Sequence, residues 1–415
     1  TKTPTDTPTP TTPAPPTNTP TATPLPPTPT PRPTLDPNAP LSSVNVSNQS
    51  GATGIRVNIR YADGSPAQGK YVKVWKQKQD VSGNPIVGDG VTDGRTDNTG
   101  SITFGLNPDT YVVGVGDIAG YPYGNVFNYQ VTPNSLLVLD VQLGRMIIGI
   151  KNADGQPLNG RYTSISLQKP DISGNPVQSD RVADGRTDNT GAIVYDLTAG
   201  DYWVDIRDIA GYYWGNPTNW RVKSGETVKI ILDLGRIRVG IKNADGRALE
   251  GKYVAVSVQK QDIDGKPIPG DRVSDGRTDN TGIIDFDLTP GNYAVYIGDI
   301  AGAPYGEQLN HVVEGAKTTS IIVTLGRVTV GLKDESGNPA RGRYVALYAQ
   351  QTDVAGNIIR GDRLIDGRTD DTGLLNLDIT AGHYVMEIEG FALQNDVNVE
   401  SGHVTFSDGN GFQVR

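Results

Sequence analysis

Cysteine is absent from this 415-residue sequence, which excludes disulfide bonds, a thiolate nucleophile and thiolate metal ligands. Histidine occurs only at His311, His383 and His403, and none of the three recurs on the sequence repeat described below. A basic block is also missing: 37 Lys and Arg face 46 Asp and Glu, giving a formal net charge of −9. This balance disfavours binding to nucleic acids and anionic membrane surfaces. No run approaches the roughly 18 apolar residues that a membrane-spanning helix needs.

Residues 1–40 form a Thr/Pro-rich tail, with 14 threonines and 13 prolines in the first 34 positions. Such a composition cannot bury a core, so we expect polyproline II or disordered chain. It is also typical of O-glycosylated stalks. Because the chain begins at Thr1 rather than at methionine, we expect a processed, secreted form. The threonines expected to carry O-linked sugar are Thr3, Thr5, Thr7, Thr9, Thr11, Thr12, Thr17, Thr19, Thr21, Thr23, Thr28, Thr30 and Thr34.

Residues 41–54 connect the tail to the rest of the chain. Val44 and Val46 alternate with polar residues and predict a short strand. Asn45 and Asn48 each begin an Asn-x-Ser sequon, which makes them candidates for N-glycosylation.

The remaining sequence is four copies of one unit, at 55–145, 146–236, 237–327 and 328–415. The octapeptide DGRTDNTG begins at Asp93, Asp184 and Asp275, and its variant DGRTDDTG begins at Asp366. The first three units end in Leu-Gly-Arg, at 143–145, 234–236 and 325–327, and the next strand is expected immediately afterwards. Without a flexible linker, we expect the four domains to form a rod.

Each unit alternates apolar and polar residues with a period of two. The first unit shows this at Ile55, Val57 and Ile59, and equivalent triplets begin the other three. About seven short strands in some 90 residues predict an all-β fold of four tandem antiparallel β-sandwiches. We expect Tyr111, Tyr202, Tyr293 and Tyr384 at equivalent half-buried corners.

The octapeptide is compatible with a turn or with a metal site. Asp97 and Gly100 fit the first and last positions of a type I turn, and Asp93, Arg95 and Asp97 would share one face of an extended strand. Calcium is the alternative, because Asp89, Asp93 and Asp97 recur in every unit. Carboxylates spaced by four along a strand do not converge on one ion. We therefore predict a turn, with no catalytic, cofactor-binding or metal-binding residue.

The segments ADGSPAQGKYVKV and TDNTGSITFGLNPDTYVVGV resemble the prealbumin-like β-sandwiches of bacterial surface proteins, namely the carboxypeptidase-regulatory-like and Cna-B-like repeats. The resemblance covers about 360 residues and implies an Ig-like or prealbumin-like scaffold used in stalks, adhesin shafts and pilus subunits. Some relatives carry a Lys–Asn isopeptide bond. Lys151, Lys242 and Lys333 lie near the expected lysine position, but the partner Asn and the acid are missing, so we expect solvated lysines.

Aromatic residues gather in loops that follow a repeated Asp-Ile-Ala-Gly motif in the first three units. Such residues either stack on sugars or pack against a neighbouring domain or chain, and packing is the interpretation we favour. The candidate partner or glycan contacts are Tyr121, Tyr123, Tyr129, Tyr212, Tyr213, Trp214, Trp220 and Tyr305.

The fourth unit lacks this motif, and its closing strand is interrupted, as is typical of a terminal repeat. The sequence thus favours a non-enzymatic, extracellular stalk or filament subunit at the cell surface. A carbohydrate-binding adhesin is the alternative. The strand with Val44 and Val46 could be donated to the fourth unit of another copy, which would build a head-to-tail homopolymer, or it could pair with its own first unit.

Overall fold

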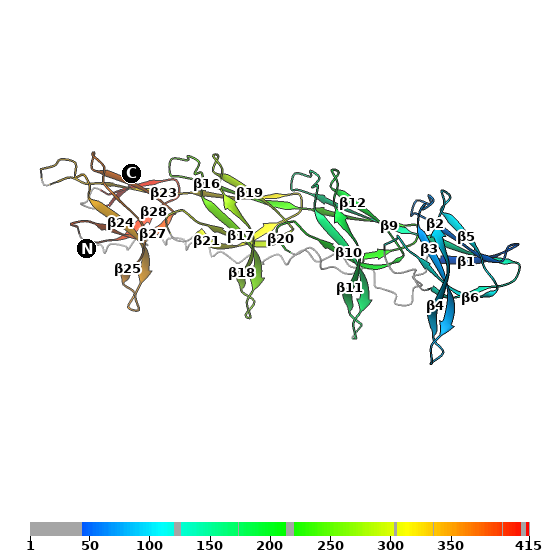
Figure 1. Cartoon of the computed structure of the whole chain (residues 1–415). Coiled ribbons are helices and arrows are strands. Elements are labelled where there is room, and N and C mark those ends of the chain that lie inside the picture. The colour runs from blue at the N-terminus through cyan, green and yellow to red at the C-terminus, as the bar shows by residue number, and fades with distance from the viewer. Residues whose placement is uncertain are drawn as a thin grey trace, which may run out of the picture. The chain divides into compact units, whose positions relative to one another are not determined.

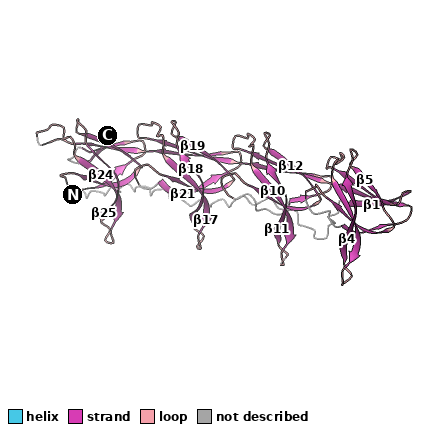
Figure 2. Ribbon diagram, in the orientation of Figure 1, coloured by secondary structure: helices cyan, strands magenta, loops and turns pink. Residues whose placement is uncertain are grey.

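The computed structural model describes residues 44–119, 126–172, 174–212, 220–302, 305–334, 336–391, 393–407 and 412–414. Every regular element among them is a β-strand (Figures 1 and 2). In this described part of the chain, no helix has the length and apolar character needed to cross a membrane. The tail, with its candidate O-glycosylation sites, lies outside the described residues.

The strands follow the four sequence repeats. The first contains β1 (Val44–Ser50), β2 (Gly54–Arg60), β3 (Tyr71–Gln79), β4 (Pro85–Arg95), β5 (Ser101–Gly105), β6 (Asp109–Val115), β7 (Val126–Val131) and β8 (Ser135–Gln142). The second contains β9 (Gly144–Lys151), β10 (Tyr162–Pro170), β11 (Pro176–Arg186), β12 (Ala192–Leu197), β13 (Gly200–Ile206), β14 (Trp220–Val222) and β15 (Thr227–Asp233).

The third repeat contains β16 (Gly235–Lys242), β17 (Tyr253–Gln261), β18 (Pro267–Arg277), β19 (Ile283–Leu288), β20 (Gly291–Ile297), β21 (Tyr305–Val313) and β22 (Thr318–Thr324). The fourth contains β23 (Gly326–Gly331), β24 (Tyr344–Thr352), β25 (Ile358–Arg368), β26 (Leu374–Ile379), β27 (Gly382–Ile388), β28 (Gln394–Val399), β29 (Val404–Ser407) and β30 (Phe412–Val414).

Each repeat is a sandwich of two sheets, which confirms the predicted fold class. In the second repeat the sheets have the orders β12-β9-β15 and β11-β10-β13-β14, and the same pattern recurs in the others. One pair in each repeat is parallel, namely β2 with β8, β9 with β15, β16 with β22 and β23 with β29, because the later strand of each pair returns from the opposite sheet. Alternation alone does not reveal this, since parallel and antiparallel strands share the period of two.

Alternating side chains fill the space between the sheets. Ile55, Val57 and Ile59 are fully buried, as the sequence pattern predicts. The four corner tyrosines are more deeply buried than expected, with exposed fractions of 2%, 0%, 0% and 1% for Tyr111, Tyr202, Tyr293 and Tyr384. Each hydroxyl donates to the carbonyl oxygen four residues earlier, so burial leaves no unpaired donor.

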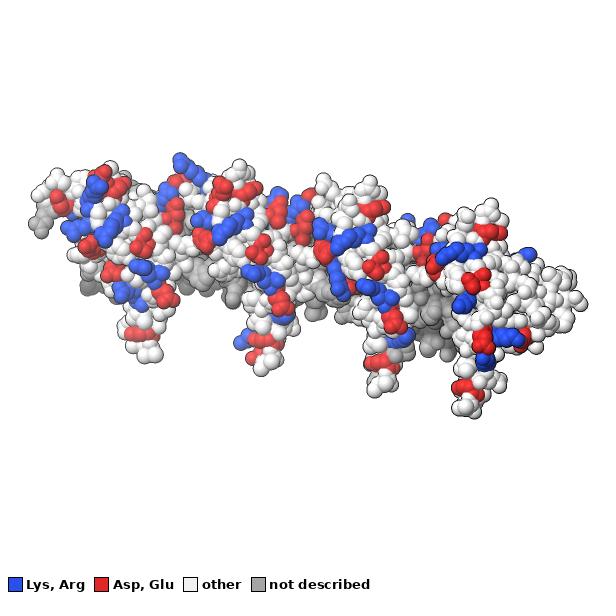
Figure 3. Space-filling view, viewed as in Figure 1, with Lys and Arg blue, Asp and Glu red and all other residues white. Residues whose placement is uncertain are grey.

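One pair of neighbouring strands in each repeat continues into a long hairpin that extends beyond the body of the domain; the pairs are β3 and β4, β10 and β11, β17 and β18, and β24 and β25 (Figure 1). Figure 3 shows Lys and Arg interspersed with Asp and Glu over the visible face, without an extended basic patch on that face.

Candidate functional site at the junctions between repeats

The three places where one repeat meets the next are called junctions below. Leu143 is fully buried in the core of the first repeat, and β9 of the second repeat starts at the following residue. The same arrangement recurs at Leu234 and Leu325. The chain therefore passes from one core into the next domain with no free linker.

A turn of the following repeat closes over this passage. The amides of Gly225, Ala316 and Gly402 donate to the carbonyls of Leu143, Leu234 and Leu325, at 3.0, 2.9 and 3.1 Å. The glycine after each leucine permits this approach: a Cβ on Gly144 would overlap the carbonyl oxygen of Lys223. The Leu-Gly-Arg motif thus needs glycine for a close backbone contact.

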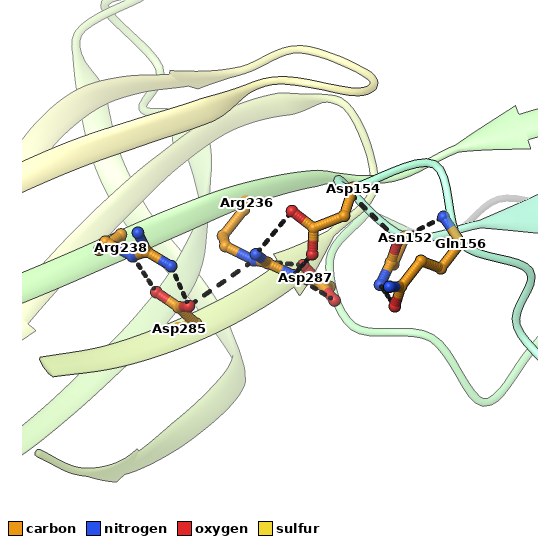
Figure 4. A network of polar contacts seen from close by, with 7 residues as sticks. All are labelled: Asn152, Asp154, Gln156, Arg236, Arg238, Asp285 and Asp287. Atoms are coloured by element: carbon orange, nitrogen blue, oxygen red, sulfur yellow. Dashed lines mark hydrogen bonds and ion pairs between the residues drawn. The ribbon is translucent and has the colours of Figure 1, made fainter. Parts of the chain in front are cut away.

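The arginine of the motif joins two repeats electrostatically. Arg236 lies between Asp154 of the second repeat and Asp287 of the third, with N–O distances of 2.8 Å to each (Figure 4). The side-chain oxygen of Asn152 accepts a hydrogen bond from the Asp154 amide and so shapes the turn that carries this carboxylate. The Arg236 side chain is 12% exposed, and the hydrogen bonds that it donates to Asp287 and Asp154 raise its pKa above its usual value.

The other two junctions repeat this pairing. Arg327 contacts Asp245 and Asp378, both at 2.8 Å. Arg145 contacts Asp196 at 2.8 Å but reaches Asp63 only at 3.4 Å. The arginine bridge is therefore tighter at the second and third junctions than at the first.

The Asp-Ile-Ala-Gly motif supplies the second bridge, and the octapeptide holds it in place. Arg186 of the octapeptide donates to the Gly160 carbonyl and to the Asp208 carboxylate, both at 2.6 Å. Asp208 itself has a positive φ of 62°, which redirects the chain toward the next repeat. The equivalent pairs are Arg95 with Asp117 and Arg277 with Asp299.

The next two residues of the motif enter different cores. Ile209 packs on the core of its own repeat, whereas Ala210 packs on the core of the third repeat. The Ala210 carbonyl accepts the amide of Thr289 at 3.0 Å. Ala119 and Ala301 bind Thr198 and Thr380 of their following repeats in the same way, at 3.1 and 3.0 Å. The motif is therefore a connector between domains.

Tyr212 extends this connector at the second junction. Its ring lies edge-on to that of Tyr293 in the third repeat, with centroids 5.3 Å apart. Its hydroxyl lies 2.7 Å from the Gln259 carbonyl and 2.5 Å from that of Asn292. Burial raises the pKa of the Tyr212 hydroxyl. This residue, predicted as a partner or glycan contact, is thus occupied by packing within the chain.

Tyr293→Phe is expected to weaken the second junction, between the second and third repeats. The Tyr293 hydroxyl accepts the Tyr212 amide at 3.2 Å and also bonds the Thr289 carbonyl. Its loss leaves a part-buried amide unpaired, at a cost of about 1–3 kcal/mol. Hydrogen exchange should therefore accelerate at the Tyr212 amide. Tyr111→Phe is the control, because the Tyr111 hydroxyl bonds only within the first repeat; equal exchange in both variants would contradict the prediction.

Other aromatic candidates divide between described and undescribed positions. Tyr129 is buried in the first core, and Trp220 packs against the second. Tyr121, Tyr123, Tyr213 and Trp214 lie outside the described residues, as does the side chain of Tyr305. Among the described members of this set, Tyr212 is the one that packs against the core of the following repeat.

The octapeptide forms the predicted turn, but its charged row is not a strand face. The strand ends at Arg95, and Asp97 lies in the turn, where its carboxylate accepts the amides of Thr99 and Ser101. These bonds lower the pKa of Asp97, with the Thr99 hydroxyl as the largest contributor. Sequence reasoning missed that Arg95 holds Asp117, a residue 22 positions away.

Calcium is expected to bind no tighter than about 10⁻⁴ M, the weak end of extracellular modules. The Asp97 carboxylate is already committed to its turn, and no group of three or more His, Asp or Glu in the described ranges is placed to hold a metal. Isothermal titration calorimetry checks this expectation. A heat near four equivalents per chain would overturn it.

The spare strand β1 lies on the first repeat. It pairs antiparallel with β8 from Val44↔Val141 to Ser50↔Ser135. Asn45 and Asn48 are exposed on it, accessible for modification, and Val46 is 53% exposed. The fourth-repeat edge expected to accept a donated strand carries β30, which pairs with β29. Of the two arrangements left open by the sequence, the structure has β1 on its own domain. Lys151, Lys242 and Lys333 are exposed, as expected for solvated lysines.

Both ends of the array lack the junction groups. Ser336 stands where the earlier repeats place Asp63, Asp154 and Asp245, and Gly390 replaces the aspartate of the connector. At the other end, Gly54 and Gly105 replace the arginine and its own-repeat aspartate. The junction contacts therefore occur between repeats of one chain and are not provided between its two ends.

Acid is expected to weaken the third junction. A hydrogen bond from Arg327 lowers the pKa of Asp245 below 3.8. A carboxylate with a lowered pKa stabilises the fold above its unfolded pKa, and this contribution disappears as the pH falls through the folded pKa. Protection of the Gly402 amide, which donates to the Leu325 carbonyl across this junction, should therefore fall below about pH 4, measured as exchange relative to the unfolded chain at the same pH. Asp245→Asn is the control, because the variant lacks the carboxylate and should lose this pH dependence. A pH profile equal to that of the wild type would contradict the assignment.

Comparison with known proteins gives structural matches only. No protein-family model matches the chain, and no curated protein matches it. The Bacillus anthracis TIE protein matches at 15% identity and a TM-score of 0.21, over 88% of this chain and 75% of that one. GBS52, the minor pilin of Streptococcus agalactiae, matches at 17% identity and a TM-score of 0.26, over 43% and 94%. BcpA, the major pilin subunit of Bacillus cereus, matches at 16% identity and a TM-score of 0.18, over 65% and 100%. The strand pairing, rather than these matches, defines the fold of this chain.

Proposed function

We propose that this chain is a non-enzymatic structural subunit of an extracellular stalk or filament at the cell surface. The observation that carries the proposal is the threefold repetition of one junction, with its leucine, arginine bridge and Asp-Ile-Ala-Gly connector. A linker-free junction with contacts on both sides resists rotation of one domain against the next. A set of such junctions suits a spacer that holds its ends apart.

Small-angle X-ray scattering of the full chain tests the spacer. One narrow distribution of interatomic distances, unchanged between low and high salt, is expected if the junctions hold the repeats at fixed angles. A variant with Gly211→Ala and Gly302→Ala, which disrupts two connectors, should broaden this distribution. A wild-type chain that already scatters as flexibly linked domains would exclude the proposal. Immunogold microscopy of intact cells tests the surface location independently.

The Thr/Pro-rich tail is proposed to carry O-linked sugar on several of its 14 threonines. Its composition offers no core, and glycans on threonine keep such segments extended and protect them from proteases. Intact mass spectrometry of the native protein should show a mass above that of the bare polypeptide. A mass equal to the polypeptide would exclude this part of the proposal.

Head-to-tail assembly by donation of β1 has a structural cost. The strand would leave a seven-residue ladder on β8, and β30 would have to leave β29. Deletion of residues 1–50 separates the possibilities: if filaments of native appearance still form, β1 does not connect the copies. The glycan-binding alternative rests on aromatic loops, of which Tyr212 is occupied within the chain. A glycan array probed with the full chain tests the rest.

A further inference from the structure

The last strands of the two inner repeats, β15 and β22, lie at sheet edges, and no described strand pairs with their outer sides. The equivalent strand is covered in both outer repeats, by β1 on β8 and by β30 on β29. Both covering strands run antiparallel to the strand they cover. This edge of the sandwich therefore accepts an antiparallel strand wherever the chain supplies one.

The open edge is also regular. β15 pairs with β9 over seven residues without a register shift, whereas the long hairpin strands at the edge of the opposite sheet contain shifts in every repeat. Bulges of that kind protect an edge from pairing with another chain. β15 contains no bulge and no proline, so this protection is missing there.

The backbone direction identifies the free groups. The Arg145 amide donates to the Glu226 carbonyl, so in this parallel ladder the even-numbered residues of β15 face β9. The amides and carbonyls of Lys229 and Ile231 consequently point to the free edge, as does the amide of Asp233, whereas the Asp233 carbonyl lies against Gly315 in the turn after β21. The side chains of Lys229, Ile231 and Asp233 lie on the outer face of the sheet, where Ile231 is 50% exposed.

We propose that two copies of this chain associate side by side, with β15 of one copy pairing antiparallel to β15 of the other. The chain's own spare strands, β1 and β30, already cover the outer repeats, so the partner strand must come from outside the described chain. A second copy pairs the open β15 edge of each copy at once through a twofold contact. No existing strand has to leave its sheet, in contrast to strand donation.

Charge complementarity fixes the register. With the twofold axis at Ile231, each Lys229 lies opposite Asp233 of the other copy, and the two Ile231 side chains meet. The two Ile231 residues form a hydrogen-bonded pair of an antiparallel ladder, and each Lys229 carbonyl accepts the Asp233 amide of the other copy. The strand Thr227–Asp233 has no net charge, because Lys229 and Asp233 cancel. The chain's net charge of −9 therefore does not repel the copies at this contact.

A charge-swap experiment on the full chain tests this register by sedimentation velocity. Lys229→Asp and Asp233→Lys should each weaken dimerisation by about tenfold or more, because like charges then face each other in two pairs. The double variant should dimerise as the wild type does, and so should a mixture of the two single variants. Ile231→Pro removes two central hydrogen bonds and should leave monomer, whereas Ile231→Ala keeps its amide and should retain dimer.

Melting temperatures of all variants report whether the fold is intact. A wild-type chain that stays monomeric at its highest soluble concentration would overturn the proposal. A dimer that survives Ile231→Pro, or single charge variants that the double variant does not rescue, would overturn it as well. The proposal is independent of the stalk function, because it concerns only the edge of the second repeat.

Discussion

Alanine at Gly302 is expected to open the third junction. Gly302 has a φ of +123°, which L-residues rarely adopt, and an added Cβ would overlap the hydroxyl oxygen and crowd the backbone of Thr380 in the fourth repeat. Strain of the backbone and overpacking each cost roughly 1–3 kcal/mol. The connector should therefore withdraw, and the hydrogen bond from the Thr380 amide to Ala301 should break.

Hydrogen exchange at the Thr380 amide is the measurement. Gly356→Ala is the matched control, because Gly356 also has a positive φ, of 87°, in the hairpin turn of the fourth repeat, but a Cβ there meets no atom within 4 Å. Both variants carry the backbone strain, and only Gly302→Ala carries the clash. Equal exchange rates at Thr380 in the two variants would refute the account of the connector.

Methionine at Arg236 should uncouple the second and third repeats. The substitution keeps much of the apolar stem but leaves Asp154 and Asp287 without their shared cation. Hydrogen bonds to charged groups contribute about 1.5–3 kcal/mol each in protected sites, and the partial exposure of both aspartates places the expected loss near 2 kcal/mol. Urea unfolding measures the loss in free energy. Scanning calorimetry is expected to resolve two thermal transitions in the variant and one in the wild type.

Arg238→Met is the control for this prediction. Arg238 is 42% exposed and pairs with Asp285 at 2.7 Å inside the third repeat, and Asp285 also lies 3.9 Å from Arg236 (Figure 4). An exposed pair of this kind contributes about 0–1 kcal/mol. A loss of equal size in the two variants would mean that Arg236 acts as an ordinary surface ion pair.

The sheets could be predicted from the sequence because burial follows the alternation of side chains. Ile148 and Val239, for example, occupy the positions that their period of two assigns to the core. The pairing partners could not be predicted in the same way. β2 and β8 are parallel, and nothing in their patterns distinguishes this from an antiparallel pair.

The junction residues escaped prediction because they obey no period. Asp117, Ile118 and Ala119 follow each other directly, yet they bind an arginine, their own core and the next core respectively. A signal was present: the motif occurs in the three copies that have a successor and is missing from the fourth. That co-occurrence indicates a role in joining domains. The aromatic loops were expected to pack against a neighbouring domain or chain, but their composition did not identify which residues make the contacts.

The three junctions share one arginine bridge and one connector, and this repetition affects how such a gene can change. An inner repeat receives its predecessor and holds its successor through the same side chains, so one inner copy fits after another without new contacts. Duplication or loss of a whole inner repeat by recombination would therefore preserve the arginine bridge and the alanine connector at each junction. The length of the molecule can vary in steps of one domain over evolutionary time, while the two specialised end copies remain in place.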